Sequence, residues 1–406
     1  MSKNVIVGQS GGPTAVINAS LAGVFSEAKR CGLGKVFGMR NGIKGLLERR
    51  IIDMQSYINN QIDVEILKRT PSSFLGSCRY KLPKIEGGED VYKQIFDILE
   101  EHGIGYFFYI GGNDSMDTIM KLSKYGESIN SPIRFMGVPK TIDNDLAVTD
   151  HSPGFGSAAK YIASTTKELI LDAQVYNNSA VTVVEVMGRN AGWLAAAAAL
   201  AKGDDSIGPD LIYLPEVVFN VDSFMDKVAK ISADHPATVI VSEGIKLADG
   251  RYVNEIDSEN NAVDAFGHKQ LTGTASYLSK EISKKLGVKT RAIEFATIQR
   301  CAAHIQSATD VTEAYAVGSQ AVKAAVNGST NRVIIIKRIA SEPYAFATDA
   351  IEIEKMANIE KHVPSEWILK SGDGVTQDYI DYALPLIQGE MSPYYVGGMP
   401  RHIILR

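Results

Sequence analysis

The chain has 406 residues, of which 45% are hydrophobic and 22% are charged, and its formal charge is −5. This balance provides no basic field, so it excludes a nucleic acid or an anionic membrane surface as a partner. The three cysteines are too few and too far apart for a disulfide framework, and the N-terminus lacks the pattern of a signal peptide. We therefore expect a cytoplasmic protein with two domains or one large one.

Short runs of β-branched and aromatic residues alternate along the chain with amphipathic segments. We predict strands at residues 5–7, 106–110, 134–138, 181–186, 238–242 and 332–336, and helices at residues 91–102 and 158–174. The longest apolar run, residues 194–201, is too short for a membrane span and predicts a packed helix. Near-continuous apolar strands separated by helices are typical of parallel sheets covered on both faces. The sequence therefore predicts a doubly wound α/β fold, followed by a less regular segment at residues 341–385.

Glycine-rich and polar segments directly follow several of the predicted strands, where ligands bind in doubly wound sheets. Glycines there let the backbone approach an anion, and a helix expected from about Thr14 would offer free N–H groups. One Gly-Gly turn is as often purely structural, but two such turns with polar neighbours favour a phosphate site. The segments are GQSGGP (8–13), GGNDS (111–115), PKTIDND (139–145) and MGR (187–189).

One segment places Lys140, Thr141, Asp143 and Asp145 at the end of a buried strand. Phosphoryl transfer needs charge neutralisation, an oxygen ligand for a metal and an acceptor for the proton of the attacking hydroxyl. This cluster could supply all three. Its composition alone fits a plain loop with an Asx-turn equally well.

The ordered set of motifs resembles the 6-phosphofructokinases. The resemblance implies two doubly wound (Rossmann-like) three-layer domains with the active site in the cleft between them. A larger pyrophosphate- and metal-binding domain would comprise residues 1–150 plus about 298–365, a smaller fructose 6-phosphate-binding domain about 151–297, and a C-terminal elaboration about 366–406. The motifs are SGG (10–12), FLGSCR (74–79), GGNDS (111–115), PKTIDND (139–145), VEVMGR (184–189), SEG (242–244) and QR (299–300).

The resemblance also implies roles for individual residues. Asp143 would be the general base that takes the proton from the 1-hydroxyl of the sugar, and Thr141 would contact the sugar or the moving phosphoryl group. The implied catalytic set is Lys140, Asp114, Thr141, Asp143 and Arg189. The implied substrate-binding set is Gly12, Arg79, Thr141, Ile142, Asp143, Met187, Gly188, Arg189, Glu243, Arg291, Thr297 and Arg300.

Two positions predict which phosphoryl donor is used. Where members that use ATP have glycines, this chain has Asp114 and Lys140. The carboxylate of Asp114 would repel the α-phosphate of a nucleotide, and the ammonium of Lys140 could stabilise the leaving phosphate. The pair resembles the pyrophosphate-dependent branch. The expected reaction is therefore reversible transfer from pyrophosphate to fructose 6-phosphate, which gives fructose 1,6-bisphosphate and phosphate.

The chain departs from the family pattern at several positions. The usual metal-binding aspartate is Asn113, so we expect Mg²⁺ to bind Asn113 and Asp114. At the sugar end, Thr297 replaces a histidine or tyrosine, and Ala180 replaces an arginine that neighbouring subunits usually lend. Sugar recognition would then need other residues, for which the candidates are His304, Tyr394 and Arg401.

Two residues near the N-terminus bear on regulation and assembly. Effector-site arginines of the bacterial ATP-using enzymes correspond to Ala22 and Ser26, so we expect no allosteric control by nucleotides and either a homodimer or a homotetramer. Three alternatives remain open at this point. They are an ATP-dependent phosphofructokinase, a non-catalytic regulatory subunit that binds sugar phosphates, and a kinase of the NAD or diacylglycerol type, which would explain only one motif.

Overall fold

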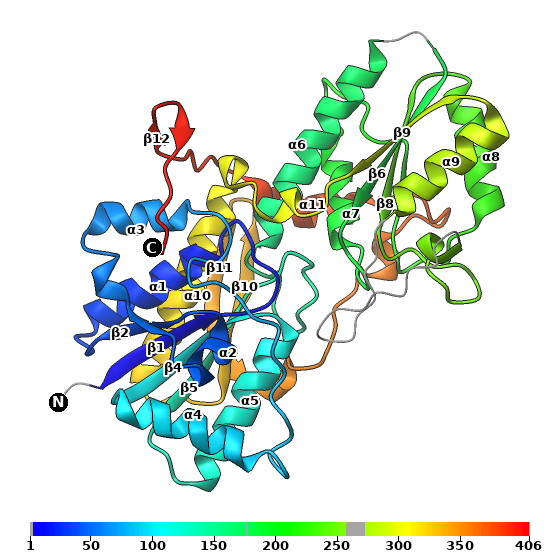
Figure 1. The fold of residues 1–406 in the computed structure, drawn as a ribbon. Coiled ribbons are helices and arrows are strands. Elements are labelled where there is room, and N and C mark those ends of the chain that lie inside the picture. The colour runs from blue at the N-terminus through cyan, green and yellow to red at the C-terminus, as the bar shows by residue number, and fades with distance from the viewer. Residues whose placement is uncertain (1–2, 176–177, 257–272, 406) are drawn as a thin grey trace.

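The computed structural model describes residues 3–175, 178–256 and 273–405, and these residues form two lobes, each built on its own sheet (Figure 1). The larger lobe contains a seven-stranded sheet with the strand order β11-β10-β5-β4-β1-β2-β3. Its strands are β1 (Asn4–Gln9), β2 (Val36–Met39), β3 (Ile51–Asp53), β4 (Ile104–Gly111), β5 (Arg134–Pro139), β10 (Arg332–Ser341) and β11 (Tyr344–Glu352).

The central strands of this sheet run parallel, whereas the two edge strands, β3 and β11, run antiparallel to their neighbours. Strand β10 lies beside β5, although the whole second sheet intervenes between them in the sequence. The chain therefore leaves the larger lobe after β5, builds the smaller lobe, and returns to extend the first sheet.

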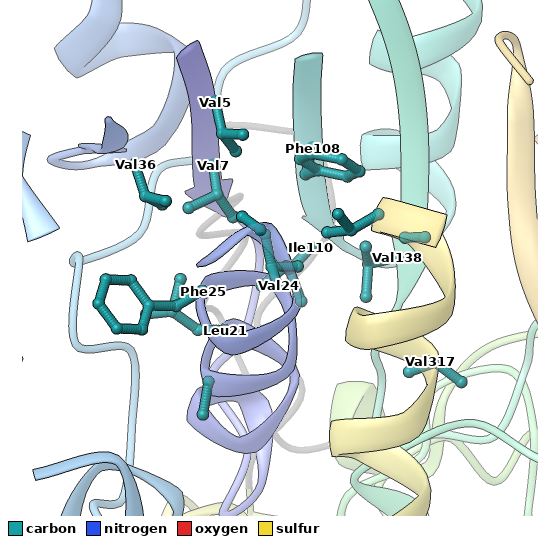
Figure 2. Close-up of a cluster of buried hydrophobic side chains, with 14 of the residues drawn as sticks. Val5, Val7, Leu21, Val24, Phe25, Val36, Phe108, Ile110, Val138 and Val317 are labelled. Carbon is teal, nitrogen blue, oxygen red and sulfur yellow. The ribbon is translucent and has the colours of Figure 1, made fainter. Parts of the chain in front are cut away.

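Helices cover both faces of the seven-stranded sheet. On one face, Val5 and Val7 of β1 pack with Leu21 of α1 and Val317 of α10, as Figure 2 shows, while Ile6 is buried on the opposite face. Burial on both faces explains why these strands read as continuous apolar runs. The helices of this lobe are α1 (Ile17–Arg30), α2 (Gly42–Leu47), α3 (Gln61–Lys68), α4 (Glu89–Glu101), α5 (Asn113–Ser128) and α10 (Ala308–Val326).

Helices α1 and α10 touch through their backbones at two glycines. A Cβ atom added at Gly23 would lie 2.2 Å from the carbonyl oxygen of Tyr315, and one added at Gly318 would lie 2.1 Å from that of Ser20. Such distances leave room only for glycine at both positions. The helix that returns from the far end of the sequence is thereby locked against the first helix of the chain.

The smaller lobe contains a four-stranded parallel sheet with the order β7-β8-β6-β9. Helices α8 and α9 pack with one set of its buried side chains, while α6, α7 and α11 pack with the other. Its strands are β6 (Ala180–Val186), β7 (Leu211–Tyr213), β8 (Ala237–Ser242) and β9 (Lys289–Glu294). Its helices are α6 (Phe155–Gln174), α7 (Trp193–Ala196), α8 (Val221–Ser232), α9 (Thr274–Leu286) and α11 (Gln377–Ala383).

The predicted fold class is confirmed, and all six predicted strands and both predicted helices are present. The sequence did not predict β3, β7, β9 and β11, which are edge strands, the short internal strand β2, or the two-residue strands β12 and β13 near the C-terminus. Strand β11 lies in the segment expected to be less regular. The first helix begins at Ile17 rather than near Thr14, and the alanine-rich run forms the short α7 followed by a 3-10 helix, Ala197–Ala201.

Each lobe has its own sheet, whereas the predicted domain boundaries at about residues 150, 297 and 365 stay predictions. Beyond the second sheet's last strand, the chain crosses back to the larger lobe, then supplies α11 to the smaller one and ends in a small hairpin of β12 (Tyr395–Val396) and β13 (Met399–Pro400). Within the described ranges, every helix is too short or too polar to cross a lipid bilayer.

Candidate active site

A cleft with a volume of about 780 Å³ opens beyond the carboxyl ends of β1, β4, β5, β6 and β8. Both lobes line it, as expected for ligand sites in doubly wound sheets. Most of the residues that the sequence singled out come together here. They are Gly12, Arg79, Asn113, Asp114, Lys140, Thr141, Ile142, Asp143, Met187, Arg189, Glu243 and Arg300.

The two glycine turns form one wall of the cleft. Gly11 has a φ of +74°, and a Cβ atom added there would lie 3.3 Å from Lys140 Nζ, so cationic groups approach the turn closely. Because α1 begins only at Ile17, its N-terminus is not directly at this turn, contrary to the prediction. Helix α5 does begin directly after the second turn, at Asn113, and no side chain caps it. The second turn thus presents free N–H groups and a positive dipole end to an anion.

Lys140 is buried beneath the first turn. Its ammonium group donates a hydrogen bond of 2.7 Å to the carbonyl oxygen of Gly12, and its backbone N–H donates to the carbonyl oxygen of Gly111 at 3.0 Å. Burial lowers the pKa of Lys140 to about 8, although the carboxylates of Asp143 and Asp145 oppose that shift. The lysine therefore joins both turns and brings a titratable cation to the floor of the cleft.

Two carboxylates follow Lys140 in the loop after β5. The backbone N–H of Asp143 donates to the hydroxyl oxygen of Thr141 at 3.1 Å, which fixes the turn that carries the aspartate. Burial raises the pKa of Asp143, against the influence of Lys140, Arg189 and Arg300. Burial, with the nearby charge of Asp143, raises the pKa of Asp145 to about 7. A carboxylate with a raised pKa is a better proton acceptor than an ordinary aspartate.

The smaller lobe contributes a backbone turn and a glutamate. The N–H of Gly188 donates to Glu243 Oε1 at 3.3 Å, and the N–H of Met187 donates to Gln299 Oε1, also at 3.3 Å. Burial, together with the charge of Asp143, raises the pKa of Glu243 to about 8. At neutral pH this side chain is therefore largely protonated and can donate a hydrogen bond to a sugar hydroxyl.

Arginines complete the cleft. Burial lowers the pKa of the Arg300 guanidinium, and the positive charge of Arg79 lowers it further. Arg189 enters from the opposite lobe, where its charge acts on both Asp143 and Glu243. The guanidinium groups of Arg300 and Arg79 repel each other, so an anion between them is favoured. Their planar forks suit phosphate oxygens.

Three residues of the predicted substrate-binding set do not line the cleft of this chain: Gly188, which lies between the lining residues Met187 and Arg189, and Arg291 and Thr297. Arg291 lies in the middle of the edge strand β9, not at its carboxyl end; its side chain is exposed and pairs with Asp172 at 3.6 Å. Thr297 is exposed just before the 3-10 helix that carries Arg300. Within one chain neither residue lies in the cleft, and their assignment to substrate binding stays a prediction.

The other candidates for sugar recognition also lie outside the cleft. His304 is exposed in a 3-10 helix, Ala303–Ile305. The ring of Tyr394 stacks on the guanidinium of Arg69 at 4.9 Å, and Arg401 donates its backbone N–H to the carbonyl oxygen of Tyr394. The tail is thereby held against the end of α3, which explains why its side chains do not reach the site.

A segment that the sequence reading missed closes one side of the cleft. After β11 the chain passes through residues 358–362, and Asn358, Glu360 and His362 line the cleft together with Asn190 of the smaller lobe. Glu360 accepts a hydrogen bond of 2.9 Å from Asn190 Nδ2. No motif marks this segment, because it is irregular backbone whose position depends on contacts with both lobes.

The residues at the start of α5 suit a hard cation. The side-chain oxygen Asn113 Oδ1 is buried and has no hydrogen-bond partner among the described residues, and the carboxylate of Asp114 follows it in the first helical turn. Neutral and anionic oxygens are the ligands that Mg²⁺ prefers. Within the described ranges, no three His, Cys, Asp or Glu side chains form a ready-made metal cluster, so substrate oxygens and water would supply the remaining ligands.

Comparison with known proteins gives a consistent result. The model of the family described as phosphofructokinase matches residues 4–325. A protein of Halomonas elongata named pyrophosphate–fructose 6-phosphate 1-phosphotransferase is 42% identical over 403 residues, which are 98% of this chain and 95% of the relative. A protein of Methylococcus capsulatus with the same name is 40% identical over 409 residues, 100% of this chain and 96% of the relative.

The fold comparison agrees with the sequence comparison. A crystal structure of a pyrophosphate-dependent phosphofructokinase from Nitrosospira multiformis superposes with a TM-score of 0.89 at 38% identity, and covers 99% of this chain and 96% of the solved one. The family match and the end-to-end alignments therefore cover both lobes. The chain belongs to the phosphofructokinase family.

Proposed function

We propose that this protein reversibly transfers a phosphoryl group from inorganic pyrophosphate to the 1-hydroxyl of fructose 6-phosphate. The observation that carries the choice of donor is the pair Asp114 and Lys140. Asp114 places a carboxylate in the first turn of α5, and Lys140 places an ammonium group beneath the opposite glycine turn. The names of the relatives from Halomonas elongata and Methylococcus capsulatus support the same donor and acceptor.

The proposed reaction is an in-line displacement at the terminal phosphorus of pyrophosphate. The 1-hydroxyl oxygen of the sugar forms a new bond to that phosphorus, and the bond to the bridging oxygen breaks. Asp143 accepts the hydroxyl proton, while the departing phosphate takes the electron pair of the broken bond. In the reverse direction the same carboxyl group returns the proton. The raised pKa of Asp143 suits both roles.

Three groups would stabilise the charge that moves during transfer. The ammonium of Lys140 would bind the departing phosphate, since it already lies against the first glycine turn, at Gly12. Arg189 would neutralise the moving phosphoryl group from the side of the smaller lobe, and Thr141 would orient Asp143 through its hydroxyl oxygen. These contacts are fixed before the reaction, so little reorganisation opposes the transition state.

The sugar would lie on the smaller lobe. Met187 and Gly188 form the backbone turn beneath it, and the protonated carboxyl of Glu243 would donate to a sugar hydroxyl. Arg300 and Arg79 would face phosphate groups at the boundary between the two substrates. The proposed sugar-binding residues depart most from the family pattern. They would therefore determine which ketose phosphate the protein accepts.

We propose Mg²⁺ as the metal, held by Asn113 and Asp114. Phosphoryl transfer generally requires a divalent cation, which draws charge from the phosphate oxygens. The unpartnered Asn113 Oδ1 supports this assignment, because a buried carbonyl oxygen without a donor is costly unless a cation meets it. Asn113 and Asp114 would hold the cation, and substrate oxygens and water would supply its other ligands.

We also propose a homodimer or homotetramer in the cytoplasm. Arg291 is exposed on the edge strand β9, where it lines a small pocket together with Ala180, and it does not line the cleft of its own chain. Its predicted contact with the sugar phosphate then requires a cleft in a neighbouring subunit. The three cysteines form no disulfide, which is typical of a reducing compartment.

A donor assay separates this proposal from its alternatives. The purified protein would be given Mg²⁺ and fructose 6-phosphate with either pyrophosphate or ATP, alongside Asp143→Ser and a control, Asp222→Ser, in the exposed first turn of α8. We expect turnover with pyrophosphate only, lost in Asp143→Ser and retained in the control. Turnover with ATP alone would identify an ATP-dependent enzyme, and binding of the sugar phosphate without turnover would identify a regulatory subunit.

A further inference from the structure

One short segment joins the two loops that carry the proposed catalytic groups. Residues 360–363, which we call the brace, follow β11 and lie outside the part of the chain that the family model matches, residues 4–325. The brace passes between the loop of residues 141–150, which carries Asp143, and the loop of residues 188–193, which carries Arg189. These two loops belong to different lobes (Figure 1).

The brace binds the loop of residues 141–150, the first loop, mainly through hydrogen bonds from Lys361. The backbone N–H of Lys361 donates to the carbonyl oxygen of Asp145 at 2.8 Å. Its ammonium group donates to the carbonyl oxygens of Asp150 at 2.8 Å and Thr149 at 3.2 Å. Glu360 forms an isolated antiparallel bridge with Leu146. Both ends of the segment that follows Asp143 are therefore attached to one lysine.

The same residues hold the second loop. The indole N–H of Trp193 donates to the carbonyl oxygen of Lys361 at 3.0 Å, and the ammonium of Lys361 lies 5.0 Å from the centre of the Trp193 ring. Asn190 donates its side-chain amide to Glu360 at 2.9 Å, and His362 Nδ1 donates to the carbonyl oxygen of Asn190 at 3.0 Å. Asn190 is the direct neighbour of Arg189, so these contacts fix the backbone that carries the guanidinium.

A third contact anchors the end of the brace. The carboxylate of Glu216 accepts the N–H of Val363 at 3.0 Å and the N–H of Gly192 at 2.8 Å. The brace and the second loop thus share one acceptor. Burial of Lys361 in this junction lowers its pKa to about 8, although the carboxylates of Asp150 and Asp145 oppose the shift. A partly buried lysine is costly to keep charged, and here carbonyl oxygens from the first loop and an aromatic face from the second compensate for it.

We propose that Lys361 is a positioning residue that holds the general base Asp143 and the phosphate-facing Arg189 at a fixed separation across the cleft. This inference rests on the proposed phosphoryl transfer. Lys361 does not line the cleft, and its hydrogen bonds are with the two loops, so it acts through them. Small displacements of positioned groups are sufficient to cost about 100-fold in rate.

The test compares Lys361→Met with a matched control, Lys227→Met. Methionine keeps the apolar stem over Trp193 and removes the ammonium group. Lys227 also ties the C-terminal segment to the smaller lobe, through bonds to Asp373 at 2.6 Å and to the carbonyl oxygen of Ser371 at 3.3 Å, but it lies away from the cleft. The wild-type protein is first assayed with pyrophosphate and fructose 6-phosphate, so that failure of the proposed function is recognised separately.

We expect Lys361→Met to lower kcat by about 10- to 100-fold while KM for each substrate changes less than about threefold. Lys227→Met should leave kcat within about twofold of wild type, even if both variants lose thermal stability. If Lys361→Met does not fold, Trp193→Phe removes one bond of the brace from the other lobe and should lower kcat severalfold. An active wild type together with unchanged kcat in the folded brace variant would overturn the inference.

Discussion

The ammonium nitrogen of Lys140, at the end of β5, lies 2.7 Å from the carbonyl oxygen of Gly12, in the turn after β1. The strand between them in the sheet, β4, ends in the other glycine turn. One lysine therefore joins the two phosphate-facing turns. Its charge state is set by burial, which makes the site sensitive to pH.

Loss of the Lys140 ammonium should abolish most of the transfer and remove one limb of the pH profile. The pKa of Lys140 in the free protein is about 8, so kcat/KM should fall as pH rises through that value. Lys140→Met should lower kcat by about 100- to 1,000-fold and lack this basic limb. Lys124→Met, at an exposed position of α5, is the control and should keep the wild-type kcat and the basic limb. A basic limb that persists in Lys140→Met would contradict the assignment.

Removal of the Glu360 charge should shift the acidic limb of the pH profile of kcat/KM to lower pH. Burial is the main reason that the pKa of Asp143 is raised, and Glu360 adds to it while Lys140, Arg189 and Arg300 oppose it. Glu360→Gln keeps an oxygen for Asn190 but removes the negative charge. The pKa of Asp143 should fall, so kcat/KM should begin to rise at a lower pH than in wild type.

The matched control for this charge change is Glu366→Gln. Glu366 lies in the same C-terminal connection, in the 3-10 helix Ser365–Trp367, but its side chain is exposed and away from the cleft. The acidic limb of the kcat/KM profile of Glu366→Gln should coincide with that of the wild-type protein. If both variants shift the limb equally, the effect comes from net charge rather than from the position of Glu360.

Replacement of Asp114 should relax the choice of donor. Asp114→Gly removes the carboxylate that we expect to repel the α-phosphate of a nucleotide, so measurable turnover with ATP should appear. Turnover with pyrophosphate should fall about 100-fold, since a proposed metal ligand is lost. Asp90→Gly makes the same change in the first turn of α4 and should alter neither donor. Ratios of kcat/KM for the two donors measure the effect, and a ratio equal to that of wild type would rule out this role.

A buried histidine behind the site should make stability depend on pH. His151 lies between Asp150, at 2.8 Å, and Glu313, at 2.6 Å. Burial alone would lower its pKa, but Glu313 and Asp150 outweigh burial and raise the pKa from 6.5 to about 9. The stabilisation is therefore complete below pH 6.5 and is lost as pH rises through about 9.

Denaturant midpoints measured at pH 6, 7.5 and 9 test this expectation. The wild-type midpoint should fall over that range, whereas His151→Gln should start lower and fall less. His304→Gln, at an exposed position, serves as the control and should follow the wild type. A wild-type midpoint that rises with pH would show that the charged pair does not stabilise the folded state.

The part of the site that could be predicted from the sequence lies directly after buried parallel strands. Gly12, Asp114 and Lys140 follow apolar runs whose period and length identify them as central strands. Since carboxyl ends of parallel strands meet at one edge of a sheet, the sequence order of these turns already implied that they converge.

The remainder depends on contacts between residues far apart in the chain. Strands β3 and β9 are only partly buried, so they carry no continuous apolar signal. Arg291 was assigned to the sugar site by resemblance to the family, but it lies at an exposed position in the middle of an edge strand, outside the cleft of its own chain. The brace has neither periodicity nor glycine, and only its bonds to two lobes reveal its position.

The return of the chain to the larger lobe has a consequence for synthesis on the ribosome. Strand β5 ends at Pro139, but its neighbour β10 and the covering helix α10 begin only at Arg332 and Ala308. Until those residues emerge, β5 has an open edge, and the apolar face of α1 around Gly23 and Val24 faces water. All strands of the smaller lobe's sheet have emerged by Glu294, but α11, which packs on one side of that sheet, follows only at Gln377–Ala383. We therefore expect the nascent larger lobe to leave apolar surface uncovered until the chain has passed Ser341.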